Sequence, residues 1–257
     1  MLTAFLAALF VLVIAMAGAW AVQRATGNSG WIDTIWSFAV GDAALLALAL
    51  MPGDGARRLL LALLVGLWAA RLGLHILLRT RKISDDPRYQ ALMAGWGDAA
   101  GRRLFSFLQV QALAGAVLVG AVMLAAATPA PVLAPATLAL AALGVLAIAG
   151  EALADAQLAA CKRQRPPSGI CDSGLWGRSR HPNYFFEWLF WCAVAGLALV
   201  PPFGALSLLA LGAPAMMYAL LRYGSGVPHL EAHMRRTRPD AFAAYAARVP
   251  VFFPRLW

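Results

Sequence analysis

The chain has 257 residues, of which 61% are hydrophobic and 13% charged, and its 21 Lys and Arg against 12 Asp and Glu give a net charge of +9. An ordinary soluble domain carries about a quarter charged residues, and a disordered chain has low hydrophobicity, so this composition excludes both classes. A mean hydropathy of +0.71 predicts an integral membrane protein.

Seven apolar stretches are long enough to cross a bilayer as helices, which takes roughly 20 residues. The first begins at residue 1 without the basic region of a secretory signal, and we expect it to be retained. The last charge-free run, residues 188–221, is too long for one span and is divided at Pro201-Pro202, because a proline ring blocks helix continuation. The expected spans are residues 1–22, 31–51, 59–78, 104–127, 132–150 with a helical continuation through Asp155, a sixth from near Tyr184 to the proline pair, and a seventh from there to Leu221. We therefore predict an all-α, seven-helix membrane bundle formed by residues 1–257 as a single domain.

The Lys and Arg residues concentrate on one side of this arrangement. Most lie in the loops at about 79–103 and 159–183 and in the tail, residues 223–257. By the positive-inside rule, the N-terminus lies outside and the two loops and the tail lie in the cytoplasm. The basic residues either set the membrane topology and attract anionic lipid headgroups, or they bind an anionic, water-soluble partner. Nucleic acid is not an expected partner, because no soluble basic domain exists to carry it.

The three cysteines show no metal-binding or redox spacing. Cys161 and Cys171 lie in the second of these loops, and Cys192 lies in a span. Disulfides are disfavoured in the cytoplasm, so we expect Cys161 and Cys171 to be reduced. We also expect no structural metal.

Several ionisable residues fall inside the expected spans, where a charge costs several kcal/mol and marks a candidate functional site. Asp33 lies near the cytoplasmic end of the second span, Arg71 and His75 lie one turn apart on the third, and Glu151 and Asp155 lie one turn apart on the fifth. A spacing of four places each pair on one helix face. The alternatives are structural: a helix cap for Asp33, a salt bridge for the Glu151/Asp155 pair, and an ordinary bundle histidine for His75.

The densest cluster of chemically active residues runs from Gly174 to Trp188, where a basic loop enters the sixth span. Free backbone N–H groups in the first turn of that helix, with Arg178 and Arg180 beside them, make an anion site. Asn183 and Glu187 share a helix face, so together they can hold a carboxamide. The alternative is a solvated basic turn followed by a helix.

The run Arg180-His181-Pro182-Asn183-Tyr184 followed by Glu187 resembles the signature of the steroid 5α-reductase family, including its bacterial members. The run alone also occurs in membrane methyltransferases related to isoprenylcysteine carboxyl methyltransferase. The resemblance also includes residues 31–36, residues 67–72 leading to Arg79 and Arg81, Arg88-Tyr89 with Trp96-Gly97, and the tail from Gly226 to Pro254. The second-span and tail motifs, and Asn183 with Glu187, favour the reductase.

The resemblance implies a seven-helix membrane fold and NADPH-dependent reduction of a carbon–carbon double bond conjugated to a ketone, as in a 3-oxo-Δ4 steroid that becomes the 5α-reduced product. It implies a monomer of the bacterial inner membrane that takes an apolar enone lipid or steroid from among the membrane lipids, with the cofactor site facing the cytoplasm. The residues that match cofactor-binding positions or supply cations for its phosphates are Arg71, Arg79, Arg81, Glu151, Asp155, Lys162, Arg178, Arg180, His181, Asn183, Tyr184, Glu187, Arg235, Arg236 and Tyr245.

The expected chemistry is hydride transfer to the β-carbon of the enone, with a proton donor or strong hydrogen bond meeting the charge that develops on the ketone oxygen. The family uses an acidic residue on the second span with a tyrosine on the third. Here Asp33 matches the acid, which must stay protonated to act as the donor, but Trp68 stands where the tyrosine is expected, and His75 is the substitute we predict. Trp36 and Trp68 are the expected substrate-binding residues.

Two other classes of function remain open. A membrane methyltransferase would bind S-adenosylmethionine with the same basic loop and tail, but such enzymes usually have paired glutamates in the tail, whereas this chain has Glu231 alone. A transporter or lipid-binding protein would show inverted repeats, and the sequence contains no internal repeat.

Overall fold

The computed structural model describes residues 1–164, 166 and 168–255, and within these residues it contains helices and no strand. The chain forms two compact units. Unit 1 comprises residues 1–141 and 194–213, and unit 2 comprises residues 142–193 and 214–257. The sequence-based prediction of an all-α protein is confirmed for the described residues.

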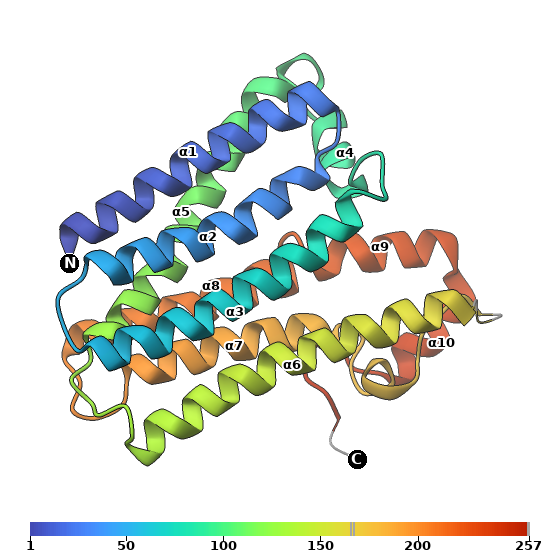
Figure 1. The fold of residues 1–257 in the computed structure, drawn as a ribbon. Coiled ribbons are helices and arrows are strands. Elements are labelled where there is room, and N and C mark those ends of the chain that lie inside the picture. Colours follow the sequence, from blue (N-terminus) through green and yellow to red (C-terminus); the bar gives the residue numbers. More distant parts are fainter. Residues whose placement is uncertain (165, 167, 256–257) are drawn as a thin grey trace. The chain divides into compact units, whose positions relative to one another are not determined.

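Unit 1 is built on helices α1 (Leu2–Thr26), α2 (Gly30–Leu50), α3 (Gly55–Thr80) and α5 (Ala100–Ala127). Figure 1 shows α1, α2 and α3 side by side, each running opposite to the one before it, and α2 also contacts α5. A short helix, α4 (Pro87–Ala94), and two 3₁₀ segments, η1 (Gly97–Ala99) and η3 (Ala205–Leu211), also belong to this unit.

Small residues allow α2 to pack closely against its neighbours. A Cβ atom at Gly41 would collide with the Cβ of Ala69 on α3, and one at Gly115 of α5 would lie 3.0 Å from Val40 of α2. Because interiors are packed as densely as organic crystals, these contacts fix the position of α2. The candidate site in unit 1 begins at the first turn of this helix.

A buried arginine ties together the chain segments at the other end of unit 1. The Arg57 side chain is 1% exposed, and its guanidinium donates to the carbonyl oxygens of Ala125 at 2.6 Å, Ala130 at 2.9 Å and Leu197 at 2.5 Å. Carbonyls in the last turn of a helix lack partners within the helix, and Ala125 and Leu197 lie in the last turns of α5 and α7. Arg57 therefore satisfies acceptors that would otherwise be buried without a donor.

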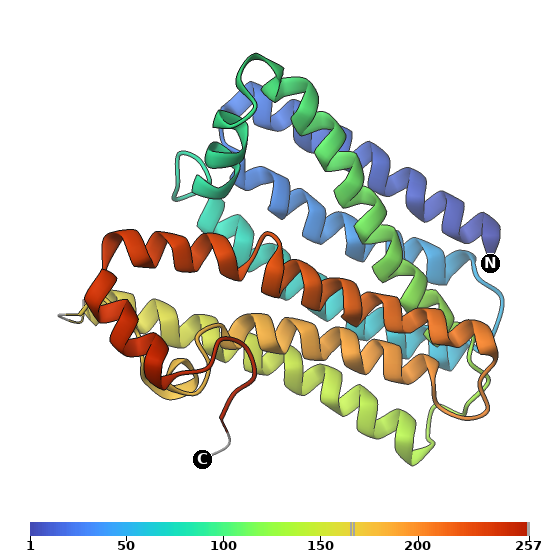
Figure 2. The same cartoon turned by 180° about the vertical axis from the view of Figure 1, so that it is seen from behind.

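Unit 2 holds most of α6 (Pro135–Gln164) and α7 (Pro182–Ala198), the 3₁₀ segment η2 (Gly174–Gly177), and α8 (Gly212–Tyr223), α9 (Val227–Thr237) and α10 (Pro239–Arg248). Figure 2 shows α9 continuing in nearly the direction of α8 before α10 turns back. Glycine permits close packing here as well, because a Cβ at Gly150 of α6 would lie 2.5 Å from the ring of Phe186 on α7.

A small core stabilises the C-terminal end of unit 2. It consists of Ile170, Phe242, Tyr245 and Val249. The hydroxyl of Tyr245 donates to the carbonyl of Trp176 at 2.6 Å, and the indole of Trp176 donates to the carbonyl of Ala154 at 2.9 Å. These bonds fasten η2, and with it the segment that leads into α7, to α6 and α10.

Within the part of the chain that the structure describes, six helical segments are long and apolar enough to cross a membrane, as expected of an integral membrane protein: Leu2–Thr26, Gly30–Leu50, Gly55–Thr80, Gly97–Ala127, Pro135–Gln164 and Ala205–Thr237. The helix α7, with 17 residues, is shorter than these. The division of the last apolar run at Pro201-Pro202 is confirmed, because α7 ends at Ala198 and η3 begins at Ala205.

The expectation for Cys161 and Cys171 was wrong, because the two cysteines form a disulfide. The helix α6 extends to Gln164, further than the sequence indicated, and carries Cys161 on its last turns. The chain then returns through Ile170, which is 4% exposed in the C-terminal core. This return brings the Cα atoms of Cys161 and Cys171 to 5.9 Å, within the range of a disulfide.

Candidate functional site

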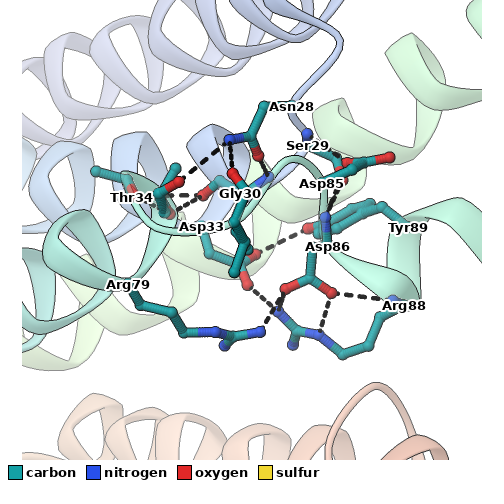
Figure 3. Close-up of polar contacts among 12 residues, drawn as sticks. Asn28, Ser29, Gly30, Asp33, Thr34, Arg79, Asp85, Asp86, Arg88 and Tyr89 are labelled. Atoms are coloured by element: carbon teal, nitrogen blue, oxygen red, sulfur yellow. Dashed lines mark hydrogen bonds and ion pairs between the residues drawn. The ribbon is translucent and has the colours of Figure 1, made fainter.

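A cluster of polar side chains in unit 1 surrounds Asp33, on the first turn of α2 (Figure 3). The phenol of Tyr89, on α4, donates a hydrogen bond to Asp33 Oδ1 at 2.9 Å, and the guanidinium of Arg88 forms an ion pair with Asp33 Oδ2. Asp33 therefore pairs with a phenol donor and a cation, and does not cap a helix by itself.

Gln111 of α5 sets the direction of the Tyr89 hydroxyl. Its Nε2 donates to the Tyr89 oxygen at 2.9 Å, so the phenol proton is the one that points at Asp33. Burial raises the pKa of Tyr89 well above its ordinary value, and the nearby Asp33 charge adds to this increase. Tyr89, which is 6% exposed, is consequently protonated at neutral pH.

A second carboxylate, that of Asp86, also pairs with Arg88. Asp86 is 2% exposed, and one of its oxygens accepts from Arg88 Nε at 3.0 Å while the other accepts from Arg79 Nη2 at 2.8 Å. Burial alone would raise the pKa of Asp86, but hydrogen bonds and charge from Arg88, with the charge of Arg79, hold it below its ordinary value. Asp86 also caps α4 by accepting from the Arg88 backbone N–H at 2.9 Å.

The loop before α4 is fastened to the turn between α1 and α2 (Figure 3). Asn28 Nδ2 donates to the carbonyl of Ile83 at 2.9 Å, and the backbone N–H of Ser29 donates to Asp85 Oδ1 at 2.7 Å. The Ser29 hydroxyl donates to the same Asp85 oxygen. These bonds place α4, and therefore Tyr89, beside the first turn of α2.

Tyr89 was not predicted as the partner of Asp33. The tyrosine was expected on the third span, with His75 as the predicted substitute, whereas the structure places Tyr89 of α4 beside Asp33. Arg88-Tyr89 was visible as part of the family resemblance, but nothing in the linear pattern placed it beside Asp33.

The other residues of unit 1 that were predicted to act in catalysis or to bind substrate or cofactor differ in their burial and in their contacts. Trp68 is fully buried, which is the setting of a core residue. Trp36 donates from its indole to the carbonyl of Gln111 at 3.0 Å and thereby contacts the residue that orients Tyr89. Arg71 is half-buried on α3, and His75 and Arg81 are exposed near the end of that helix.

In unit 2, the predicted carboxamide-binding residues Asn183 and Glu187 lie on α7, and the predicted acidic pair Glu151 and Asp155 lies on the facing helix α6. Asn183 Nδ2 donates to Asp155 Oδ1 at 3.2 Å, and the indole of Trp191 donates to Glu187 Oε1 at 2.9 Å. Glu151 and Glu187 are each 5% exposed. The structure therefore brings Asn183 and Asp155 together, and it places buried carboxylates on the same two helices.

Glu231 organises the start of α7. This carboxylate is 4% exposed and accepts from Arg180 Nε at 2.8 Å and Arg235 Nη2 at 2.9 Å, with His181 Nε2 at 3.3 Å. The Arg180 Nη1 also donates to the carbonyls of Ala246 and Val249, at 3.2 and 2.8 Å. The Arg180 guanidinium therefore binds groups of the protein itself, whereas it was predicted to bind a phosphate of the cofactor.

The other predicted residues of unit 2 divide into buried and exposed groups. Tyr184 stacks on the His181 ring with 5.5 Å between centroids. Tyr245 is 5% exposed, burial raises its pKa, and its hydroxyl bonds the chain as described above. Lys162, Arg178 and Arg236 are exposed. Among the residues that the structure describes, no three His, Cys, Asp or Glu side chains lie together as metal ligands would.

Comparison with known proteins identifies one family. Residues 19–249 match the model of the family described as "Protein of unknown function (DUF1295)". No curated protein and no solved structure matches the chain.

Proposed function

We propose that this chain, which belongs to the DUF1295 family, is an NADPH-dependent membrane reductase that saturates the carbon–carbon double bond of an apolar enone such as a 3-oxo-Δ4 steroid. The observation that carries the proposal is the hydrogen bond from Tyr89 to Asp33. The resemblance to steroid 5α-reductases calls for an acid and a tyrosine acting together, and these two residues are such a pair.

Tyr89 is the proton donor in this proposal. NADPH supplies the hydride, and negative charge develops on the ketone oxygen, so a hydrogen-bond donor aimed at that oxygen lowers the barrier. Tyr89 holds its proton at neutral pH and is oriented by Gln111. Asp33, held by Arg88, positions the phenol before substrate enters.

The residues of α6 and α7 fit the cofactor's carboxamide. A carboxamide presents one acceptor oxygen and two N–H donors, and Asn183 offers a donor while Asp155 and Glu187 offer acceptors. Arg178 and Arg236, both exposed in unit 2, suit phosphate groups. Arg180 and Arg235 form ion pairs with Glu231, and these ion pairs hold the start of α7, the helix that carries Asn183 and Glu187.

The proposed topology has seven spans, with α7 as the sixth, the N-terminus outside, and the cofactor site facing the cytoplasm of a bacterial inner membrane. A span takes roughly 17–25 residues, and α7 has 17. The bias of Lys and Arg toward the loops at 79–103 and 159–183 and the tail supports this orientation, whereas the Cys161–Cys171 disulfide in the second loop is unusual for a cytoplasmic segment.

Ligand-dependent thermal stability tests the proposal, since a ligand that binds only the folded state raises the unfolding midpoint. The detergent-purified protein is heated with NADPH, NADH or S-adenosylmethionine. We expect stabilisation by NADPH, and loss of that stabilisation in Asn183→Ala and Glu187→Ala but not in the exposed-surface control Arg103→Gln. Stabilisation by S-adenosylmethionine alone would overturn the reductase proposal in favour of a methyltransferase.

A further inference from the structure

A basic cavity lies in unit 2 where the chain returns from the end of α6. Its volume is about 290 Å³, and it is lined by Lys162, Pro166, Gly169, Cys171 and Arg238. This volume accommodates a phosphate group with ordered water. Both ionisable side chains that line the cavity are cationic.

Arg238 has no acidic partner among the described residues. Its Nη1 lies 3.7 Å from the sulfur of Met234 and 3.4 Å from the hydroxyl of Thr237, both of which are neutral. The carboxylate that follows Cys171 in the chain, Asp172, pairs with Arg248 at 2.8 Å. A half-buried guanidinium with only weak neutral contacts favours an anion, and its planar donors match phosphate oxygens.

Glycine brings the loop against the Arg238 side chain. Gly169 has a φ of +65°, and a Cβ atom there would collide with Arg238 Nε. The Gly169 N–H donates to the carbonyl of Pro166 at 2.8 Å, which closes a tight turn along the wall of the cavity. The wall is therefore shaped by a position that only glycine occupies without strain.

The disulfide links a residue that lines this cavity to α6. Cys161 precedes Lys162 on α6, and its partner Cys171 lines the cavity directly. Reduction by a dithiol would pass two electrons and two protons to the two sulfur atoms, giving two thiols and oxidising the dithiol to its own disulfide. Cys171 would then lose its covalent cross-link to Cys161 of α6.

We propose that this cavity is a binding site for a phosphate monoester or inorganic phosphate, and that the Cys161–Cys171 disulfide keeps it formed. Lys162 and Arg238 supply the charge, and Gly169 supplies the close backbone wall. The site does not depend on the reductase proposal, because it rests on the cavity, its two cations and the disulfide alone.

Calorimetric titration of the oxidised, detergent-purified protein with inorganic phosphate tests this proposal, and nanodiscs with or without phosphatidic acid distinguish a lipid phosphate from a soluble one. We expect saturable binding that weakens about tenfold, equivalent to about 1.4 kcal/mol, in Arg238→Gln and in Lys162→Gln. The matched control is Arg163→Gln, which removes one exposed charge from the same helix end without touching the cavity. Equal weakening in the control would show a net-charge effect and overturn the site, as would no saturable binding of phosphate in either medium.

Mild reduction of the folded protein tests the disulfide separately, with thiols counted before and after. We expect phosphate affinity to fall on reduction and to return on reoxidation, and the Cys161→Ser/Cys171→Ser variant to bind as the reduced protein does. Unchanged affinity after full reduction would overturn the role of the disulfide. Thermal unfolding of the reduced protein confirms that the measurement is made on folded material.

Discussion

Tyr89 and Asp33 are 56 residues apart in the sequence, and the Tyr89 hydroxyl lies 2.9 Å from the Asp33 carboxylate. The contact depends on the loop before α4, which Asn28 and Ser29 hold against the start of α2. A phenol that is buried, protonated and directed by Gln111 is suited to meet a developing negative charge.

Tyr89→Phe is expected to lower kcat for reduction of an enone about 10²–10⁴-fold, the range for loss of a general acid. NADPH binding should be unchanged, because the substitution removes only the hydroxyl. Steady-state kinetics and NADPH thermal shifts measure the two quantities, with Tyr223→Phe, an exposed tyrosine, as the control. Equal kcat values for Tyr89→Phe and the control would contradict the role of Tyr89.

Arg57→Lys and Arg57→Ala are expected to lower the free energy of unfolding by about 2–5 kcal/mol, because three buried carbonyls lose charged donors. Lysine retains the charge but cannot reach three carbonyls in one plane as a guanidinium does. Thermal unfolding in detergent measures the change, with exposed Arg103→Gln as the control. Wild-type stability of Arg57→Lys would show that the three hydrogen bonds contribute little.

Gly41→Ala is expected to destabilise unit 1 by about 1–3 kcal/mol, the usual effect of overpacking, because the new methyl group meets the Cβ of Ala69. Ala69→Gly in the same chain should restore much of the loss, since it removes the opposing methyl. The matched control is Gly18→Ala on α1, where a Cβ has nothing within 4 Å and the change should be neutral or stabilising. A failure of Ala69→Gly to rescue Gly41→Ala would argue against this close contact.

Asp86 gives the stability a defined pH dependence. Its pKa is lowered in the folded protein, so its stabilising contribution is complete above the unfolded value of about 4 and is lost as the pH falls through the lower folded value. Asp86→Asn keeps a helix cap and removes the charge, so its unfolding midpoint should fall less steeply than that of the wild type between about pH 5 and 3. Parallel pH profiles of the two proteins would be inconsistent with this contribution.

The helices of this protein follow from its sequence more directly than its polar contacts do. Long apolar stretches and the Pro201-Pro202 pair predict helix positions because length and hydrophobicity act locally. The Tyr89–Asp33 pair depends on how a polar loop folds against another turn, and no periodic pattern encodes that. The same holds for Arg180, whose three acceptors come from α9, α10 and the residue after α10. The disulfide could not be predicted because it depends on where α6 ends, and the ends of a helix are harder to predict from a sequence than the helix itself.

Transfer of deuterium from the reactive position of labelled NADPH to an enone, catalysed by the purified protein, tests the central claim most directly. The reductase proposal predicts one deuterium at the β-carbon of the saturated ketone, formed by the wild type and much more slowly by Tyr89→Phe. Absence of deuterium from a range of steroid and lipid enones, with methyl transfer from S-adenosylmethionine to a lipid acceptor under the same conditions, would contradict it.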